Sequence, residues 1–179
     1  LSSSSAASDV YKRQGISTGL TQGFSIQLSQ YYGAKDFENL RKSLAHSYRL
    51  TAFIAAGVLI LSQSFASLVL TGLHTPSNII GMSLLYLRII FCGIPATAAY
   101  NMFASALRAM GNSKTPLTAM IIASVLNVSL DILFVAGFGW GVAGAAIATV
   151  IAQSFSAVYC FLILRRIDIV HLTRADFMP

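Results

Sequence analysis

The sequence predicts an all-α, polytopic membrane protein, and three observations support this fold class. Hydrophobic residues make up 55% of the chain and charged residues only 10%, whereas a soluble domain usually carries about 25% charged residues. The apolar residues form runs of about 20, the length that an α-helix needs to cross a bilayer. The basic residues gather in alternate connectors between these runs, a pattern typical of membrane helices. A strand interpretation fails because open sheet edges cannot lie in lipid.

Five membrane helices are expected, at residues 15–34, 50–70, 82–107, 116–136 and 142–164. The first is amphipathic and rich in Ser, Thr and Gln, which favours a helix that faces a bundle interior or a water-filled cavity. The third contains Arg88 and Pro95, and we expect the proline to kink it. The last is rich in Gly and Ala, which allow neighbouring helices to approach closely.

The first 14 residues differ in composition from the rest of the chain. Serine fills positions 2–5, and no apolar core follows that would make a signal peptide. We therefore interpret residues 1–14 as a non-native or disordered leader, and residues 15–179 as the membrane domain.

Basic residues lie in three of the connectors, residues 35–49, 108–115 and 165–179. They are Lys35, Arg41, Lys42, Arg49, Arg108, Lys114, Arg165, Arg166 and Arg174. The other two connectors, residues 71–81 and 137–141, contain none. The positive-inside rule therefore predicts that the three basic connectors are cytoplasmic, in a multi-pass protein of the inner (plasma) membrane. Although the net charge is +6, nucleic acid is not an expected partner, because the basic residues alternate with apolar runs.

Asp131 is the one acidic residue inside a predicted span, within NVSLDILF. An ionised carboxylate costs several kcal/mol in hydrocarbon, so such residues usually face a bundle interior and are functional. A carboxyl group that gains and loses a proton in a cavity can carry a proton cycle. Asn127 lies four residues earlier, on the same helix face. The alternative is a buried acid that only joins helices by hydrogen bonds.

Thr149 is expected close to Asp131 across a helical hairpin. If Trp140 is the apex, Asp131 lies nine residues before it and Thr149 nine residues after it. Both would then lie roughly 13 Å from the apex at the rise of an α-helix. A hydrogen bond between them is one expectation, and a bond from Thr149 to its own helix backbone is the alternative.

Three further polar residues are candidates for lining a cavity. Arg88 is the only other charge in a predicted span, and it either pairs with Asp131 or extends to the headgroups, which is the simpler interpretation. Tyr86, two residues away, points to the opposite side of that helix. Asn101 either lines the cavity or bonds a neighbouring helix.

No motif predicts an enzyme, a metal centre or a bound cofactor. Cys92 and Cys160 both lie inside apolar runs, without metal-ligand spacing. No Ser/His/Asp or Cys/His set converges on one membrane face, and no nucleotide-binding fingerprint is present.

Four segments, in order, resemble exporters of the multidrug and toxic compound extrusion (MATE) family. GFSIQLSQYYGAKD resembles the end of their second helix, and YLRIIFCGIPATAAYN with LRAMGNSKTP resembles the fourth helix and the loop after it. NVSLDILF and GVAGAAIATVIAQ resemble the fifth and sixth helices. The resemblance implies that residues 15–179 are helices two to six of the amino-terminal lobe in a twelve-helix, two-lobe transporter. Helix one and the second lobe would then lie outside this sequence.

The resemblance also implies a site and an activity. An intramembrane Asn-x-x-x-Asp on helix five resembles the branch related to the DNA-damage-inducible protein F. It implies that Asn127 and Asp131, with Thr149 and Tyr86, help to bind a coupling H+ or Na+. The implied activity is antiport, in which inward ion flow drives export of an amphipathic or cationic drug-like compound. The branch also uses an aspartate on helix one, which this sequence lacks.

Three other functions remain as alternatives. A lipid-linked oligosaccharide flippase of the same superfamily would need a large basic cavity to hold pyrophosphate, and only Arg88 could serve. A membrane enzyme would need a cluster of reactive groups at one interface, and none is visible. The unusual first 14 residues also allow an inert product of a broken gene.

Overall fold

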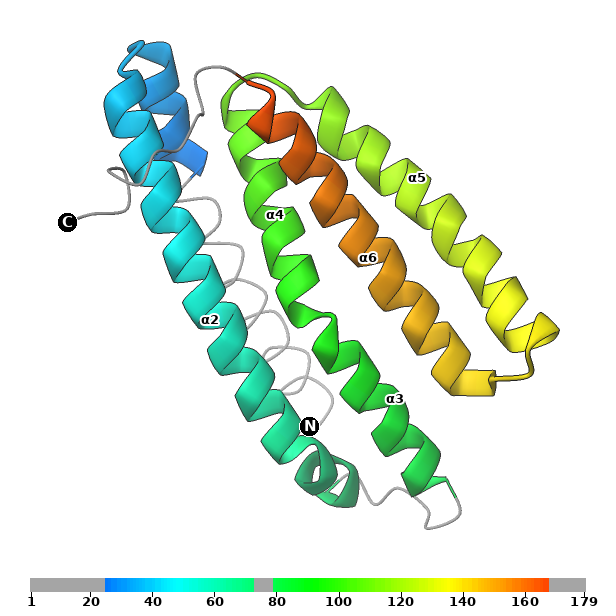
Figure 1. Cartoon of the computed structure of the whole chain (residues 1–179). Coiled ribbons are helices and arrows are strands. Elements are labelled where there is room, and N and C mark those ends of the chain that lie inside the picture. The colour runs from blue at the N-terminus through cyan, green and yellow to red at the C-terminus, as the bar shows by residue number, and fades with distance from the viewer. Residues whose placement is uncertain (1–24, 73–78, 168–179) are drawn as a thin grey trace, which may run out of the picture.

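The computed structural model describes residues 25–72 and 79–167, and this part of the chain is helical apart from short connections (Figure 1). Residues 25–33 are helical. They are followed by α2 (Phe37–Gly72), α3 (Ile80–Cys92), α4 (Ile94–Ala109), α5 (Lys114–Asp131), the π-helix η1 (Ile132–Gly137) and α6 (Gly141–Arg165). The leader expected at 1–14 and the start of the helix expected at 15–34 lie outside the described residues.

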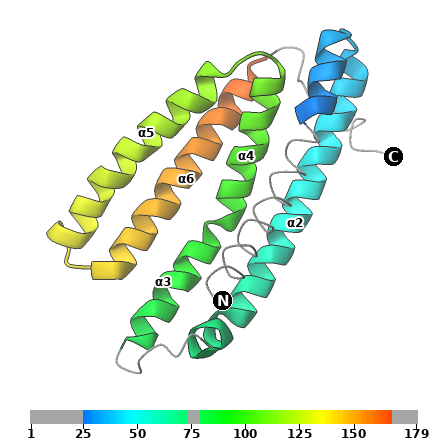
Figure 2. The same cartoon turned by 180° about the vertical axis from the view of Figure 1, so that it is seen from behind.

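Four stretches of the described chain are long and apolar enough to cross a membrane, which confirms the predicted fold class. They are Phe37–Leu68, Ile80–Ala109, Lys114–Gly137 and Gly141–Arg165. α6 packs against α5, α4 and α3, and α2 packs against α3 and α4. The helices therefore form a layer in the order α2, α3 with α4, α6 and α5, and Figure 2 shows the same order from behind.

The connections between consecutive helices lie at the two opposite ends of this layer. The turn before α2, the turn between α4 and α5, and the end of α6 lie at one end (Figure 1). The start of α3 and the η1–α6 connection lie at the other end. The connectors that were expected to be basic therefore meet at one end of the bundle.

α2 begins at Phe37, so the prediction of a connector over 35–49 was wrong for most of that segment. Leu40, Leu44 and Ser47 are all buried, at the i, i+4, i+7 spacing of one helix face. The charged residues of the segment lower its hydropathy, which hides the helix from a search for apolar runs.

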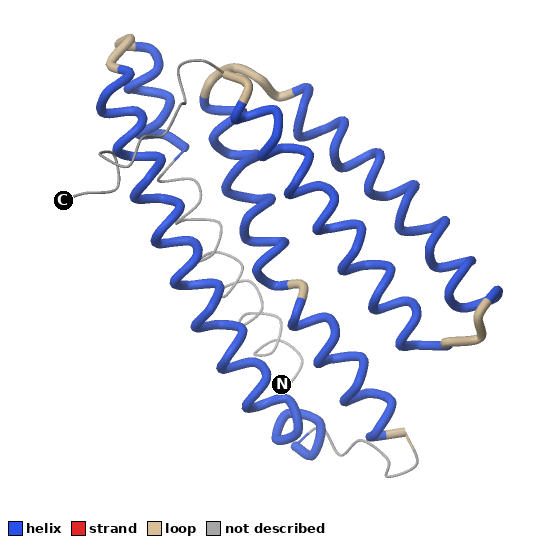
Figure 3. Tube along the Cα trace, viewed as in Figure 1, coloured by secondary structure: helices blue, strands red, loops and turns tan. Residues whose placement is uncertain are grey.

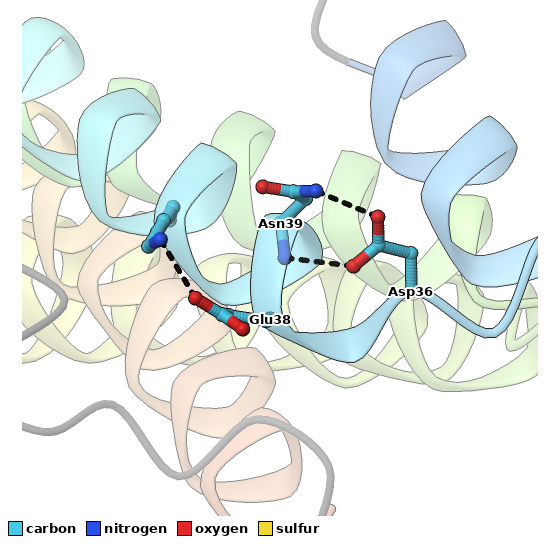
Figure 4. Close-up of polar contacts among 4 residues, drawn as sticks. Asp36, Glu38 and Asn39 are labelled. Carbon is cyan, nitrogen blue, oxygen red and sulfur yellow. Dashed lines mark hydrogen bonds and ion pairs between the residues drawn. The ribbon is translucent and has the colours of Figure 1, made fainter.

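The first turn of α2 is capped by Asp36, as Figure 4 shows. One carboxylate oxygen accepts a hydrogen bond from the Asn39 backbone N–H at 3.2 Å, and the other accepts one from the Asn39 side-chain amide at 2.6 Å. These bonds favour the charged carboxylate and lower the pKa of Asp36 below its usual value. In the same turn Glu38 and Lys42 form an ion pair at 2.8 Å. The cap explains why the helix starts before the apolar run.

The span predicted over 82–107 consists of two helices, α3 and α4, that are separated at Gly93 (Figure 3). Pro95 lies in the first turn of α4. Proline has no backbone N–H, so it cannot donate to the Phe91 carbonyl four residues earlier as a helix requires. The expected kink is therefore a break of the helix two residues before the proline.

α5 continues through η1, so the third membrane stretch runs from Lys114 to Gly137 rather than from 116 to 136. In the η1 region the Phe138 backbone N–H donates to the Leu133 carbonyl at 2.9 Å, a bond across five residues. Phe134 stacks on Trp140 with ring centroids 5.1 Å apart. α6 returns directly from this aromatic turn.

The buried core lies towards the end where the basic connectors meet. It comprises Leu28, Leu40, Leu44, Met102, Ala106, Leu107, Ala109, Met110, Ala119, Cys160 and Leu164. Elsewhere large apolar side chains face outwards, and Phe53 is 81% exposed. An apolar outer surface of this kind suits lipid or a further packed element rather than water.

Candidate functional site

An open cavity of about 320 Å³ lies between α4, α5 and α6. Its lining combines side-chain amides and hydroxyls with apolar surface, and none of the lining residues is Asp, Glu, Lys or Arg. They are Thr97, Tyr100, Asn101, Met120, Ala123, Ser124, Asn127, Thr149, Gln153 and Ser156. The cavity includes three of the residues selected from the sequence, namely Asn101, Asn127 and Thr149.

Asn127 and Thr149 join α5 to α6 in the wall of this cavity. The Asn127 amide donates a hydrogen bond to the Thr149 hydroxyl oxygen at 3.3 Å, and the Thr149 hydroxyl donates to the Ala145 carbonyl at 3.0 Å. The bond to the helix backbone that the sequence offered as an alternative is therefore present. The cross-helix partner of Thr149 is Asn127, however, and the expected bond to Asp131 is not found in the described structure.

The π-helix contributes to this difference in register. The expected depth of Asp131 assumed α-helical rise on both sides of Trp140. In η1 the backbone bonds span five residues instead of four, so more residues are needed to travel the same distance from the apex. The residue level with Thr149 therefore comes earlier in α5, and it is Asn127.

Asp131 lies one turn beyond Asn127, at the last position of α5. Its side chain is half-buried, and one carboxylate oxygen, Oδ1, is buried without a hydrogen-bond partner among the described residues. A buried acceptor without a donor carries an uncompensated desolvation cost. Such an atom is a natural ligand for a proton or a metal cation.

Tyr86 and Arg88 both lie in α3 and are exposed, outside the residues that line the cavity. The Arg88 backbone carbonyl accepts a hydrogen bond from the Gln63 side chain of α2 at 2.9 Å. Within the described residues, Arg88 and Asp131 do not form the ion pair that the sequence allowed.

The sequence analysis did not identify five of the polar residues that line the cavity. They are Thr97, Tyr100, Ser124, Gln153 and Ser156. Polar residues at the spacing of one helix face on α6 could have revealed two of them. On α6, positions 149, 153 and 156 follow the i, i+4, i+7 spacing of one face, in a helix whose other residues are mostly apolar. The Thr97 hydroxyl donates to Gln153 Oε1 at 2.5 Å, and the Tyr100 hydroxyl donates to the Pro116 carbonyl at 3.2 Å.

Metal ligands of the usual kind are not gathered anywhere in residues 25–72 and 79–167. No group of three or more His, Cys, Asp or Glu side chains in these ranges could hold a metal ion.

The family model MatE matches residues 14–133 of the chain. The chain belongs to the MATE family. The probable multidrug resistance protein YoeA of Bacillus subtilis is 33% identical over 82% of this chain and 32% of its own length. The DNA damage-inducible protein F of Escherichia coli is 27% identical over 84% of this chain. A solved multidrug resistance MATE transporter in an inward-facing conformation superimposes with a TM-score of 0.85, at 25% identity, over 92% of this chain and 38% of that one.

This MATE chain spans about a third of the length of the curated relatives that it matches. Another relative is the probable lipid II flippase MurJ of Thermotoga maritima, which is 32% identical over 72% of this chain and 26% of its own length. This chain therefore corresponds to part of a multi-pass membrane transporter fold.

Proposed function

We propose that this chain forms part of a secondary antiporter that exports amphipathic or cationic drug-like compounds in exchange for H+ or Na+. Asn127, Asp131 and Thr149 form its coupling-ion site. The observation that carries the proposal is the combination of the Asn127–Thr149 bond in the cavity wall with an unpartnered, buried carboxylate oxygen of Asp131 one turn away. Relatives named as multidrug resistance and export proteins support the substrate class.

The site would couple the ion to conformation through charge. A proton or Na+ at Asp131 removes the charge of the one acidic residue between the start of α3 and the end of α6, and it supplies the partner that Oδ1 lacks. Ion binding shifts the balance between inward-open and outward-open states if the ion binds the two states unequally. One lobe then moves against the other around the central site. The remaining lobe and the bilayer are therefore required partners.

The test is efflux by the complete protein that contains this chain, with Asp131 intact and as Asp131→Asn. Dye efflux is measured in vesicles under a pH gradient alone and under a Na+ gradient alone. Ser129→Ala is the matched control, because Ser129 lies on the same helix and donates only to the Val125 carbonyl of its own helix.

We expect Asp131→Asn to insert at the normal level and lose gradient-driven efflux, while Ser129→Ala keeps it. The gradient that drives the parent identifies the ion. Efflux by Asp131→Asn at the parent's rate would show that the carboxylate is structural. Tyr86 and Arg88 in α3 and Asn101 in α4 are the next candidates for contact with the transported compound, and Asn101 lines the cavity.

A lipid-linked flippase is the second candidate, and similarity to MurJ favours it. Pyrophosphate recognition calls for Arg or Lys side chains, and the described cavity lining contains neither. A lipid flipping assay with the same complete protein separates the two functions. Flipping without dye efflux would replace the antiporter proposal.

A further inference from the structure

The break between α3 and α4 is held from both sides by glutamines of neighbouring helices. On the α3 side, the Gln63 amide of α2 donates to the Arg88 carbonyl at 2.9 Å and lies 3.3 Å from Cys92 Sγ. On the α4 side, Gln153 of α6 accepts the bond from the Thr97 hydroxyl. Gln63 and Gln153 therefore tie the helices on either side of the break to α2 and α6.

α6 lies directly against this break. A Cβ atom at Gly93 would come within 3.0 Å of Val150 Cγ2 and 3.3 Å of Gln153 Oε1. The absence of a side chain at Gly93 therefore lets the start of α4 approach the Val150–Gln153 turn of α6. The Thr97 hydroxyl also lies 3.2 Å from the Gly93 carbonyl oxygen, so Thr97 connects the break to Gln153.

The same face of α6 carries Thr149, four residues before Gln153. Residues four apart lie one above the other on a helix, and both side chains line the cavity. Thr149 binds Asn127 of α5, and Gln153 binds Thr97 of α4. A single helix turn therefore joins the broken helix to the proposed ion site.

We propose that Gln153 is a positioning residue that couples the α3–α4 break to ion binding at Asn127 and Asp131. The inference rests on the proposed antiport function. The Thr97–Gln153 bond holds the first turn of α4 against α6 and so keeps Thr149 in place to orient Asn127. Ion binding changes what Thr149 and Asn127 contact, and the bond passes that change to the angle between α3 and α4.

The experiment is a double-mutant cycle on both ends of the bond, in the complete purified protein. The variants are Gln153→Met, Thr97→Val and the pair together, and Thr97→Ser keeps the hydroxyl. Ser154→Ala is the matched control, because Ser154 neighbours Gln153 and donates only to the Val150 carbonyl of its own helix. Two quantities are measured: the H+ or Na+ concentration for half-maximal efflux, and the shift in unfolding temperature that the ion produces.

We expect each single variant to raise the half-maximal ion concentration by about fivefold and to reduce the ion-induced shift in unfolding temperature. The double variant should match the singles, because both ends serve one bond, and Thr97→Ser and Ser154→Ala should behave like the parent. Variants that lower the maximal rate or the unfolding temperature without changing the ion concentration would overturn the inference and leave Gln153 a structural residue. A parent without any ion response would overturn the antiport proposal and this inference together.

Discussion

At the residue scale, the Thr149 hydroxyl organises the candidate site. It donates to the Ala145 carbonyl at 3.0 Å and accepts from the Asn127 amide at 3.3 Å. The donor bond fixes the direction of the oxygen lone pairs, so the Asn127 amide nitrogen is drawn towards α6. The amide oxygen of Asn127 stays outside this hydrogen bond, on the helix face that also carries Asp131. The proposed ion site therefore has two oxygen-bearing side chains, Asn127 and Asp131, on one helix face.

Replacing this hydroxyl should weaken the response to the ion. Thr149→Val keeps the shape and removes both bonds, which leaves the Asn127 amide without its acceptor. The half-maximal ion concentration should rise about fivefold, the equivalent of one hydrogen bond, in ion-dependent efflux by the complete protein. Thr149→Ser keeps the hydroxyl and should change this concentration less than twofold. Equal effects of the two substitutions would contradict the role of the hydroxyl.

At the element scale, the break between α3 and α4 requires glycine at position 93 because there is little room for a side chain, and not because the backbone is strained. Gly93 has φ −78° and ψ −13°, a conformation that any residue adopts. The constraint is close contact on two sides, because an added Cβ would meet Val150 Cγ2 of α6 at 3.0 Å and the Ile90 carbonyl oxygen of α3 at 3.1 Å. The carbonyl belongs to the backbone and cannot swing aside as a side chain can.

Gly93→Ala should therefore destabilise the protein, by about 1–3 kcal/mol as for other overpacked sites. Gly57→Ala is the matched control: Gly57 lies inside α2, a Cβ there meets nothing within 4 Å, and alanine favours a helix interior by about 0.5–1 kcal/mol. Thermal unfolding of the purified protein in detergent measures both. Adding Val150→Ala to Gly93→Ala should recover part of the loss, and an unfolding temperature unchanged by Gly93→Ala would show that α6 can move away.

At the scale of the whole molecule, the helices pack around a buried core at the end where the basic connectors lie. The core cluster joins the helical residues 25–33, the start of α2, the end of α4 and the end of α6, and Tyr48, Phe103 and Phe161 extend it with ring centroids 5.3–5.5 Å apart. The cavity between α4, α5 and α6 lies further along the bundle. The described helices thus have a closely packed end and a more open region that contains the cavity.

The orientation of these helices in the membrane can be tested by cysteine labelling. We expect the α4–α5 turn to be cytoplasmic and the start of α6 to face outwards. Ser113→Cys and Val142→Cys, both at exposed positions, are made in the complete protein after replacement of its other cysteines, including Cys92 and Cys160. A membrane-impermeant maleimide added to intact cells should label position 142 and spare position 113. The reverse pattern would overturn the predicted topology.

The sequence by itself determined the fold class, the family resemblance and the intramembrane position of Asn127 and Asp131, because apolar runs, isolated polar residues and local motifs are read directly along the chain. Only the tertiary structure decided which residues meet. Thr149 pairs with Asn127 instead of Asp131 because η1 changes the register, and Gln153 reaches Thr97 because Gly93 lets α4 approach α6. The charged residues at the start of α2 hid this part of the helix from a search for apolar runs. Its buried face, which includes Leu40 and Leu44, is defined only by the helices that pack against it. Contacts between helices depend on the register of one helix against another and on how closely the two approach. Neither can be predicted from the residue spacing within one segment.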